Sequence, residues 1–347
     1  MAEIGMIGAG SWGTALSWLL ENNGHHVTMW SSLEAEIELL NKYREHKDKL
    51  PGVMLGDDIT FTGDIAEACE GKEIVVLAVP SPFTRNTARL MSSHIDPSQT
   101  IVSVAKGIEE ETLFTLSQVI KDEIKGAEVV VLCGPSHAEE VGKGMPTAIV
   151  AGCRDAKRAR LVQDVFMSDV FRVYTSDDPY GMELGAALKN VIALAAGIAD
   201  GLGYGDNTKA ALITRGIHEI SRLGEAAGGK RETFQGLTGI GDLIVTCASM
   251  HSRNRRAGIL IGQGKNADEA MKEVKQVVEG VYCAKAAVAL AAKYNVPLPI
   301  ISEVNAILFN NRSAKDALRE LMLREKKDEF ISVQNPLNSE QIHASGH

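Results

Sequence analysis

Short apolar runs alternate with helical stretches over the first half of the chain. Several of these runs are apolar at nearly every position, which is typical of strands covered by helices on both faces of a parallel sheet. The alternation therefore predicts a doubly wound α/β domain. The seven predicted strands are residues 4–7, 26–30, 73–79, 100–104, 128–132, 147–151 and 171–175.

The second half of the chain has a different pattern. After residue 181 the strand signal disappears, and long Ala/Leu/Ile-rich stretches carry apolar residues at helical spacing, for example Leu184, Leu188 and Val191. We therefore expect a dinucleotide-binding sheet domain over residues 1–180 and an all-helical substrate domain over residues 181–330. Residues 331–347 are polar and unperiodic, and we expect them to form a loose tail.

The composition limits the classes of function. The chain has 347 residues, a net charge of −9, 45% hydrophobic residues and 23% charged residues, as in a globular protein with sizeable cores. Net acidity argues against nucleic-acid or anionic-membrane binding, because both need a basic face. No long uncharged apolar run predicts a membrane span. The five cysteines are scattered without metal-ligand spacing, which favours reduced thiols in a cytoplasmic protein and no bound metal.

A glycine-rich turn joins the first predicted strand to the first predicted helix. Gly8, Gly10 and Gly13 form the pattern G-x-G-x-x-G. Gly8 permits the tight turn, Gly10 lets the backbone approach a pyrophosphate, and Gly13 allows close packing of helix and strand. The helix N-terminus offers free N–H groups to phosphates. A glycine turn without a ligand is the alternative, but the flanking strands and helix favour a Rossmann-type dinucleotide site.

The end of the second predicted strand normally distinguishes NAD from NADP. A carboxylate there bonds the ribose hydroxyls of NAD, whereas a basic residue binds the extra phosphate of NADP. Ser31, Ser32 and Leu33 give neither signal, unless Glu34 reaches back. The sequence therefore predicts NAD or NADP without choosing between them.

Charged residues set among glycines form a second candidate site. Lys189 lies on a predicted helix whose neighbouring positions are mostly Gly and Ala. Desolvation there would lower its pKa and suit it to acid/base chemistry near neutral pH. A surface lysine with an extended stem is the equal alternative. Asp242 follows the run GLTGIG, whose glycines permit turns that could aim it into a cleft.

Two further segments offer groups that bind anions. Ser252, Arg253 and Asn254 supply hydroxyl, guanidinium and amide donors, a combination suited to a phosphate, although the arginines of a solvated helix start are the alternative. Lys106 follows the strand predicted at 100–104, and ligands bind at the carboxyl ends of parallel strands. His137 follows the next strand and is either an acid/base or a capping and packing residue.

Taken together, these segments resemble the bacterial NAD(P)-dependent glycerol-3-phosphate dehydrogenases along nearly the whole chain. The stretches that carry the resemblance are GAGSWGTA, LCGPSHAEE, GAALKNVIALAAGIADGLGYGDN, GLTGIGDLIVTC and HSRNRRAG, in that order. The resemblance implies a Rossmann domain followed by an all-α domain of the 6-phosphogluconate-dehydrogenase-like kind. It also implies reversible reduction of dihydroxyacetone phosphate to sn-glycerol 3-phosphate with NAD(P)H, which supplies glycerophospholipid synthesis.

The same resemblance implies roles for individual residues. Lys189 would be the proton donor and acceptor, Lys106 would polarise the carbonyl and hold the substrate, and Asp242 would orient the reacting groups. The other implied substrate contacts are Gly134, Ser136, Asn190, Ser252, Arg253 and Asn254. The implied cofactor contacts are Gly8, Gly10, Ser11, Trp12, Gly13, Lys106, Ala138, Arg253, Val277 and Glu279.

One departure from the family bears on the coenzyme. Bacterial members commonly carry a basic residue or a histidine just after the second strand, where this chain has Ser31, Ser32 and Leu33. The resemblance therefore does not imply a strong preference for NADP.

Two alternatives remain beside this interpretation. Another two-domain dehydrogenase, acting on a hydroxy acid or a sugar acid, would want a carboxylate-binding arginine rather than the cluster at 252–254. A non-catalytic dinucleotide sensor would need the glycine turn but not Lys106, Lys189 and Asp242. The apolar helical half also leads us to expect a homodimer.

Overall fold

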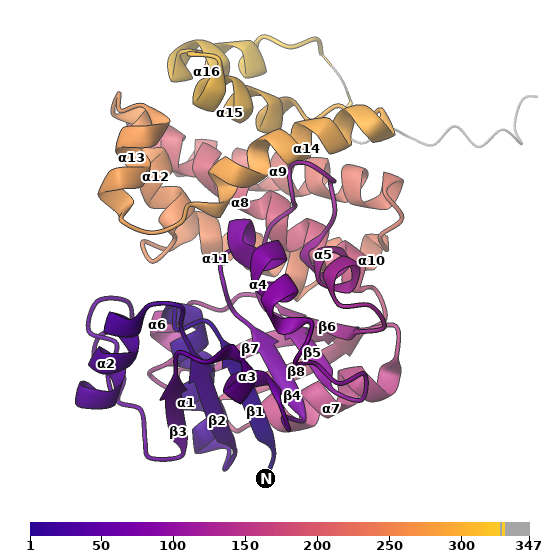
Figure 1. Cartoon of the computed structure of the whole chain (residues 1–347). Coiled ribbons are helices and arrows are strands. Elements are labelled where there is room, and N and C mark those ends of the chain that lie inside the picture. Colours follow the sequence, from indigo (N-terminus) through magenta and orange to yellow (C-terminus); the bar gives the residue numbers. More distant parts are fainter. Residues whose placement is uncertain (327, 330–347) are drawn as a thin grey trace, which may run out of the picture.

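The computed structural model describes residues 1–326 and 328–329. An eight-stranded sheet forms the N-terminal part and helices form the rest, as Figure 1 shows. The predicted fold class is therefore confirmed, whereas the tail predicted at 331–347 lies outside the described residues. The strands are β1 (Glu3–Ile7), β2 (His26–Trp30), β3 (Ile59–Thr62), β4 (Ile74–Leu77), β5 (Thr100–Ser103), β6 (Glu128–Cys133), β7 (Thr147–Gly152) and β8 (Phe171–Ser176).

The strand order creates a crevice at the carboxyl end of the sheet. The order is β3-β2-β1-β4-β5-β6-β7-β8, so the chain moves outward from β1 in one direction and later from β4 in the other. The crevice lies where the direction changes, and ligands of open α/β sheets bind there. β3 was not predicted, because Ile59–Thr62 is a short edge strand that contains two threonines and is fully buried only at its first and last residues.

Two strands correct the expectation of a parallel sheet, because β7 and β8 both run opposite to the six strands β1–β6. β7 runs antiparallel to β6, although every pairing from β3 to β6 and the pairing of β7 with β8 are parallel. A parallel return needs a crossover that spans the sheet, usually a long helix. The connection between β6 and β7 contains only the four-residue helix α6 (Ala138–Val141), so the chain re-enters the sheet from the same edge.

Helices cover both faces of the sheet, as the continuous apolar runs predict. Side chains alternate between two cores along a strand: Ile4 and Met6 of β1 enter one core, and Ile7 enters the other. The remaining helices of this part are α1 (Ser11–Asn22), α2 (Glu34–Tyr43), α3 (Ile65–Cys69), the single 3-10 turn η1 (Ser81–Phe83), α4 (Thr84–Met91), α5 (Leu116–Glu123) and α7 (Ala156–Phe166).

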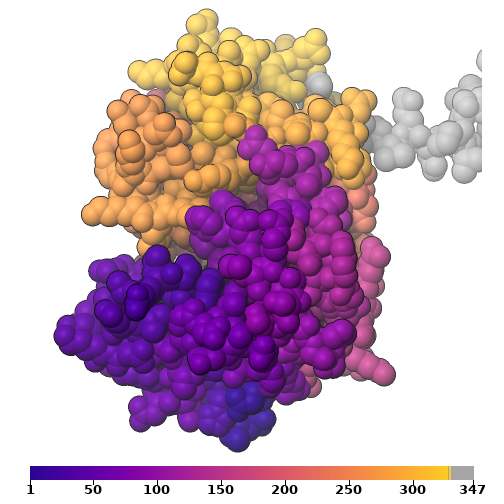
Figure 2. Space-filling view, viewed as in Figure 1, coloured from indigo at the N-terminus to yellow at the C-terminus, as the bar shows by residue number. Residues whose placement is uncertain are grey.

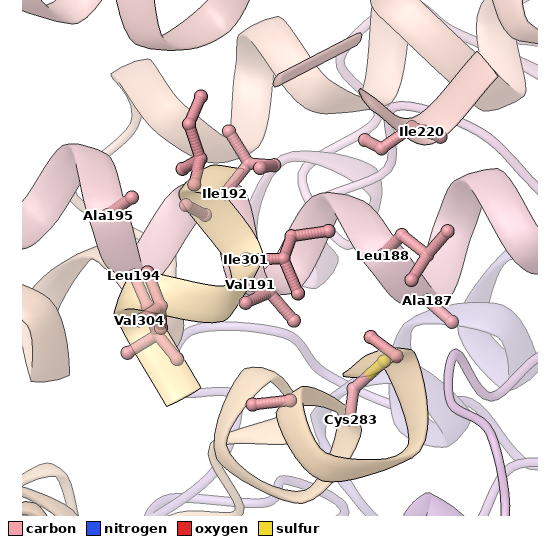
Figure 3. Close-up of a cluster of buried hydrophobic side chains, with 14 of the residues drawn as sticks. Ala187, Leu188, Val191, Ile192, Leu194, Ala195, Ile220, Cys283, Ile301 and Val304 are labelled. Carbon is pink, nitrogen blue, oxygen red and sulfur yellow. The ribbon is translucent and has the colours of Figure 1, made fainter. Parts of the chain in front are cut away.

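The helical part is built around one central helix, α8 (Pro179–Gly201). Its residues are buried from Gly181 to Ala199, and Figure 3 shows its apolar side chains among Ile220, Cys283 and Ile301 of neighbouring helices. By length and composition α8 could cross a membrane, but its whole apolar window is buried inside the protein. The other elements are α9 (Asp206–Ala226), α10 (Arg231–Gln235), the π-helical turn η2 (Leu237–Gly241), α11 (Asp242–Ala248), α12 (Arg253–Gly262), α13 (Ala267–Val274), α14 (Glu279–Tyr294), α15 (Pro299–Phe309) and α16 (Ala314–Met322).

Glycines let α8 and α12 approach until their backbones touch. A methyl group on Gly258 of α12 would lie 2.3 Å from the carbonyl oxygen of Leu194, and one on Gly197 of α8 would lie 2.1 Å from that of Arg255. No side chain fits at such positions without moving the backbone. This contact fixes the start of α12 beside the middle of α8, where Lys189 lies.

Candidate active site

A cavity opens between the carboxyl edge of the sheet and the helical part. The loops after β1, β4, β5 and β6 line one side, and α8, α11, α12 and the start of α14 line the other. Figure 2 shows the two parts meeting, the sheet part in indigo to magenta and the later helices in orange. The predicted site residues in the lining are Gly10, Ser11, Trp12, Lys106, Ser136, Ala138, Lys189, Asn190, Asp242, Ser252, Arg253, Asn254, Val277 and Glu279.

The remaining predicted glycines lie just behind this lining. Gly8 has a φ of +119°, and a methyl group on Gly13 would lie 2.0 Å from the carbonyl oxygen of Gly8. In contrast, a methyl group on Gly10 would meet no atom within 4 Å, and no side chain caps the N-terminus of α1. The open space and free N–H groups fit the pyrophosphate of a dinucleotide. Gly134 contributes its carbonyl oxygen, which accepts a hydrogen bond from Lys106 at 3.0 Å.

Lys189, Asp242 and Lys106 converge at the centre of the cavity from three separate elements. The side chains of Lys189 and Asp242 are only 5% and 1% exposed, which excludes the surface-lysine alternative. Lys189 Nζ lies 2.6 Å from Asp242 Oδ1, and Lys106 Nζ lies 2.7 Å from Asp242 Oδ2. One carboxylate therefore holds two ammonium groups, one from α8 and one from the loop after β5.

Burial and charge set the pKa values of this cluster. Burial disfavours the charged form of Lys189 and lowers its pKa to about 8, with Lys106 adding to the effect and Asp242 opposing it. Burial acts in the opposite sense on Asp242, but the two lysines outweigh it and keep the pKa of this carboxyl below its usual range. An ionised carboxylate thus orients a lysine that can give or take a proton near neutral pH.

Thr246 completes the cluster and is absent from the sequence-based predictions. Lys189 Nζ donates to Thr246 Oγ1 at 2.5 Å, and this hydroxyl donates to the carbonyl oxygen of Asp242 at 2.6 Å. Thr246 follows Asp242 by four residues on α11, so both lie on the same helix face. That spacing was available in the sequence and could have identified it.

The start of α12 forms the end of the cavity suited to an anion. The Arg253 side chain is open to solvent and makes no ion pair or side-chain hydrogen bond within residues 1–326 and 328–329. Ser252 caps α12 by accepting from the backbone N–H of Arg255 at 3.2 Å, which leaves its own hydroxyl proton free. A free guanidinium at a helix N-terminus is suited to a phosphate.

The side-chain amide of Asn254 is held by two hydrogen bonds within the protein. Its Nδ2 donates to Asn190 Oδ1 at 3.0 Å, and its Oδ1 accepts from the N–H of Gly280 at 2.8 Å. One N–H of Asn254 therefore remains for a ligand. The amide also joins α8, α12 and α14 at the cavity wall.

Glu279, a predicted cofactor contact, joins the helical part to the sheet part. Its carboxylate accepts from the backbone N–H of Ser81 at 3.1 Å and also from the Ser81 hydroxyl. Ser81 was not predicted, and a pair separated by 198 residues leaves no local sequence signal. A methyl group on Gly107 would lie 2.5 Å from Ser81 Cβ, so this link also packs against the loop that carries Lys106.

His137 lies in the cavity wall as the N-cap residue of α6. Its Nε2 is buried and has no partner in the described part of the chain, and its ring centre is 5.8 Å from that of His251. Burial, and then the charge of Lys189, lower the pKa of His137, which favours the neutral imidazole. As for metals, residues 1–326 and 328–329 contain no group of three or more His, Cys, Asp or Glu side chains that could hold an ion.

Comparison with known proteins agrees with this geometry. The sequence models for the N-terminus and the C-terminus of NAD-dependent glycerol-3-phosphate dehydrogenase match residues 3–159 and 178–319. Proteins named glycerol-3-phosphate dehydrogenase, of the NAD(P)+ type, are 64% identical in Agathobacter rectalis and 58% identical in Fusobacterium nucleatum. Each similarity covers 96% of this chain and 99% or 100% of the relative.

A solved structure extends the similarity to three dimensions. The crystal structure of glycerol-3-phosphate dehydrogenase from Coxiella burnetii has a TM-score of 0.90 and 34% identity, over 93% of this chain and 99% of that one. The resemblance inferred from the sequence motifs is thereby confirmed. The chain belongs to the NAD-dependent glycerol-3-phosphate dehydrogenase family.

Proposed function

We propose that this chain catalyses the reversible reduction of dihydroxyacetone phosphate to sn-glycerol 3-phosphate with NAD(P)H, and so supplies glycerophospholipid synthesis. One observation carries the proposal. The buried Lys189, bonded to Asp242 at 2.6 Å, lies in the same cavity as Arg253, which has no ion-pair partner among residues 1–326 and 328–329. A proton donor and a free anion-binding group in one cavity suit a phosphorylated carbonyl substrate better than a hydroxy acid or a mere dinucleotide sensor.

In this proposal the reaction is one hydride transfer and one proton transfer. When bound, the reduced nicotinamide supplies the hydride to the carbonyl carbon of the substrate. Lys189 Nζ gives its proton to the carbonyl oxygen, while Asp242 and Thr246 hold that ammonium group in place. Lys106 stabilises the negative charge that develops on the same oxygen. In the reverse direction, neutral Lys189 takes the proton from the substrate hydroxyl.

The phosphate of the substrate is placed at the start of α12. Arg253 supplies charge and two parallel N–H groups, and the Ser252 hydroxyl and the helix N-terminus add donors. Asn190 and Asn254, bonded to each other, are proposed to position the substrate between the phosphate end and Lys189. Ser136 would contribute its hydroxyl, which donates to the carbonyl oxygen of Gly134 at 2.9 Å.

The broader assignments belong to the same proposal. The division into a dinucleotide domain to residue 180 and a substrate domain after it agrees with the last strand ending at Ser176 and α8 beginning at Pro179. All five cysteines are free and buried, which suits a reducing cytoplasm. A homodimer remains a prediction.

The test is an assay of NADH and NADPH oxidation with a panel of substrates. We expect turnover with dihydroxyacetone phosphate, much weaker turnover with unphosphorylated dihydroxyacetone, and none with keto acids. Turnover of a keto acid in preference to dihydroxyacetone phosphate would contradict the proposal and favour a hydroxy-acid dehydrogenase. Tight coenzyme binding without turnover of any substrate would favour a sensor.

A further inference from the structure

A hollow at the carboxyl end of β2 has an acidic lining. It lies between the end of β2, the first turns of α2 and Gly63 after β3, and its charged lining residues are Glu34 and Glu38. Neither lysine nor arginine is among the described residues that line it. In a dinucleotide-binding sheet, the end of the second strand is where the adenosine ribose is distinguished from its 2′-phosphorylated form.

Ser31 directly follows β2, and its hydroxyl proton is donated to Glu36, which is not among the residues that line the hollow. Its Oγ donates to Glu36 Oε2 at 2.5 Å and accepts from the backbone N–H of Leu33 at 3.2 Å. A serine hydroxyl has one proton and two lone pairs, so one lone pair remains for a ligand. A ribose 2′-hydroxyl can donate to that lone pair, whereas a phosphate dianion has no proton to give.

The carboxylate behind Ser31 is ionised. Burial would raise the pKa of Glu36, but hydrogen bonds from His46, Lys49 and Ser31 outweigh it and lower this pKa to about 2. His46 Nε2 lies 2.8 Å from Glu36 Oε1, and Lys49 Nζ bonds the same oxygen. An ionised Glu36 keeps the Ser31 proton on its own side, so the direction of this hydrogen bond is fixed.

Lys49, the lysine that contacts this network, is already paired with Glu36. Lys49 neutralises Glu36 and is not part of the lining of the hollow. Its backbone carbonyl oxygen also accepts from Ser11 Oγ at 2.7 Å, which anchors the segment to the glycine-rich turn. Moving Lys49 toward a phosphate would break its ion pair with Glu36. The charged side chains that line the hollow are those of Glu34 and Glu38.

We propose that this chain selects NADH over NADPH, with Ser31 accepting a hydrogen bond from the ribose 2′-hydroxyl and Glu34 and Glu38 repelling a 2′-phosphate. The kinetic part of this inference rests on the proposed function, but coenzyme binding alone also reports it. Ser31, Glu34 and Glu38 are therefore specificity-determining residues at the adenosine end, far along the coenzyme from the reacting atoms.

The experiment measures both coenzymes in binding and in turnover. Isothermal titration without substrate gives the Kd of NADH and of NADPH, and steady-state assays with dihydroxyacetone phosphate give kcat/KM for each. We expect NADH to be favoured by about tenfold or more in both measurements, since juxtaposed like charges oppose binding. Raising the salt concentration should narrow the ratio, because exposed charges are screened.

Substitutions in and outside the hollow test which residues set the NADH/NADPH ratio. Glu34→Gln/Glu38→Gln should narrow the NADH/NADPH ratio several-fold, and Ser32→Arg, which places a cation at the hollow, should narrow it further or reverse it. Asp164→Asn/Asp169→Asn removes two exposed carboxylates from the same part of the chain, outside the hollow, and should leave the ratio as in the wild type.

The outcomes separate this inference from the proposed function. Equal or tighter binding of NADPH, or an NADH/NADPH ratio that Glu34→Gln/Glu38→Gln leaves unchanged, would overturn the inference. Turnover of dihydroxyacetone phosphate would still uphold the function. Preferential binding of NADH without any turnover of that substrate would uphold the inference and overturn the function.

Discussion

The two ends of the cavity are built in opposite ways. At the proposed reaction end, Lys189, Asp242 and Thr246 are buried and bonded to one another. At the phosphate end, Arg253 is exposed and has no partner within the described part of the chain. The contrast teaches that the proposed proton donor is held in place by neighbouring side chains, whereas the proposed anion-binding group is open to a ligand.

The largest expected effect is the loss of kcat on substitution of the buried Lys189. Lys189→Met removes the proton donor but keeps much of the side-chain volume, so kcat should fall by about 10²–10⁴-fold, the usual contribution of general acid–base catalysis. Coenzyme affinity, measured by titration, should change little. The exposed Lys157→Met, on α7, is the matched control and should leave kcat as it is. A Lys189 variant that retains near-normal turnover would remove Lys189 from the mechanism.

A substitution of Arg253 at the proposed phosphate end should weaken substrate binding more than it slows turnover. Arg253→Ala deletes a charge-assisted contact worth about 1.5–3 kcal/mol, which corresponds to about 10–100-fold in the KM for dihydroxyacetone phosphate. The kcat should fall less than the KM rises. Unphosphorylated dihydroxyacetone at saturating coenzyme provides the control, because its KM should depend on Arg253 far less than the KM of the phosphorylated substrate. An unchanged KM would break the assignment of this end to the phosphate.

The distance between the two ends depends on the contact of α8 with α12. Gly258→Ala would place a methyl group 2.3 Å from the Leu194 carbonyl oxygen, so the helices must separate. We expect a loss of about 1–3 kcal/mol in the free energy of unfolding, typical of overpacking, measured by urea denaturation.

Gly205→Ala is the control that measures the cost of a glycine-to-alanine change without a close backbone contact. Gly205 precedes α9, has a φ of −91° and faces open space, so Gly205→Ala should cost far less. If Gly258→Ala were as stable as Gly205→Ala, then the close contact of the two backbones would not be required.

The smallest effect should come from Thr246. Thr246→Val keeps the shape but removes the hydroxyl that accepts from Lys189 Nζ, so we expect a loss of about 1 kcal/mol of transition-state stabilisation, or roughly fivefold in kcat. Thr246→Ser should restore most of the rate. If the serine variant were no better than the valine variant, Thr246 would serve packing and not the position of Lys189.

The sequence allowed prediction of the sheet where local pattern decides it. β1, β4 and β6 were found because almost all of their residues are buried and their runs are apolar. β3 was missed because this short edge strand contains two threonines and no continuous apolar run. The antiparallel direction of β7 was missed because it follows from the length of the connection between β6 and β7.

The sequence allowed prediction of which residues form the candidate site, but not of the contacts between them. Residue types and motif order indicated Lys189, Asp242 and Arg253. However, the burial of Lys189 depends on helices that pack around α8 from distant parts of the chain, and periodicity alone left it undecided. The Ser81–Glu279 link and the orientation of the Ser31 hydroxyl are likewise tertiary features with no local signal.

The pH dependence of kcat in both directions tests the central claim most directly. Lys189, with a pKa of about 8, must be protonated to reduce the carbonyl and neutral to take a proton from the hydroxyl. The account predicts that kcat for reduction falls as the pH rises through about 8, while kcat for oxidation rises over the same range. Two profiles that move in the same direction through that range would contradict it.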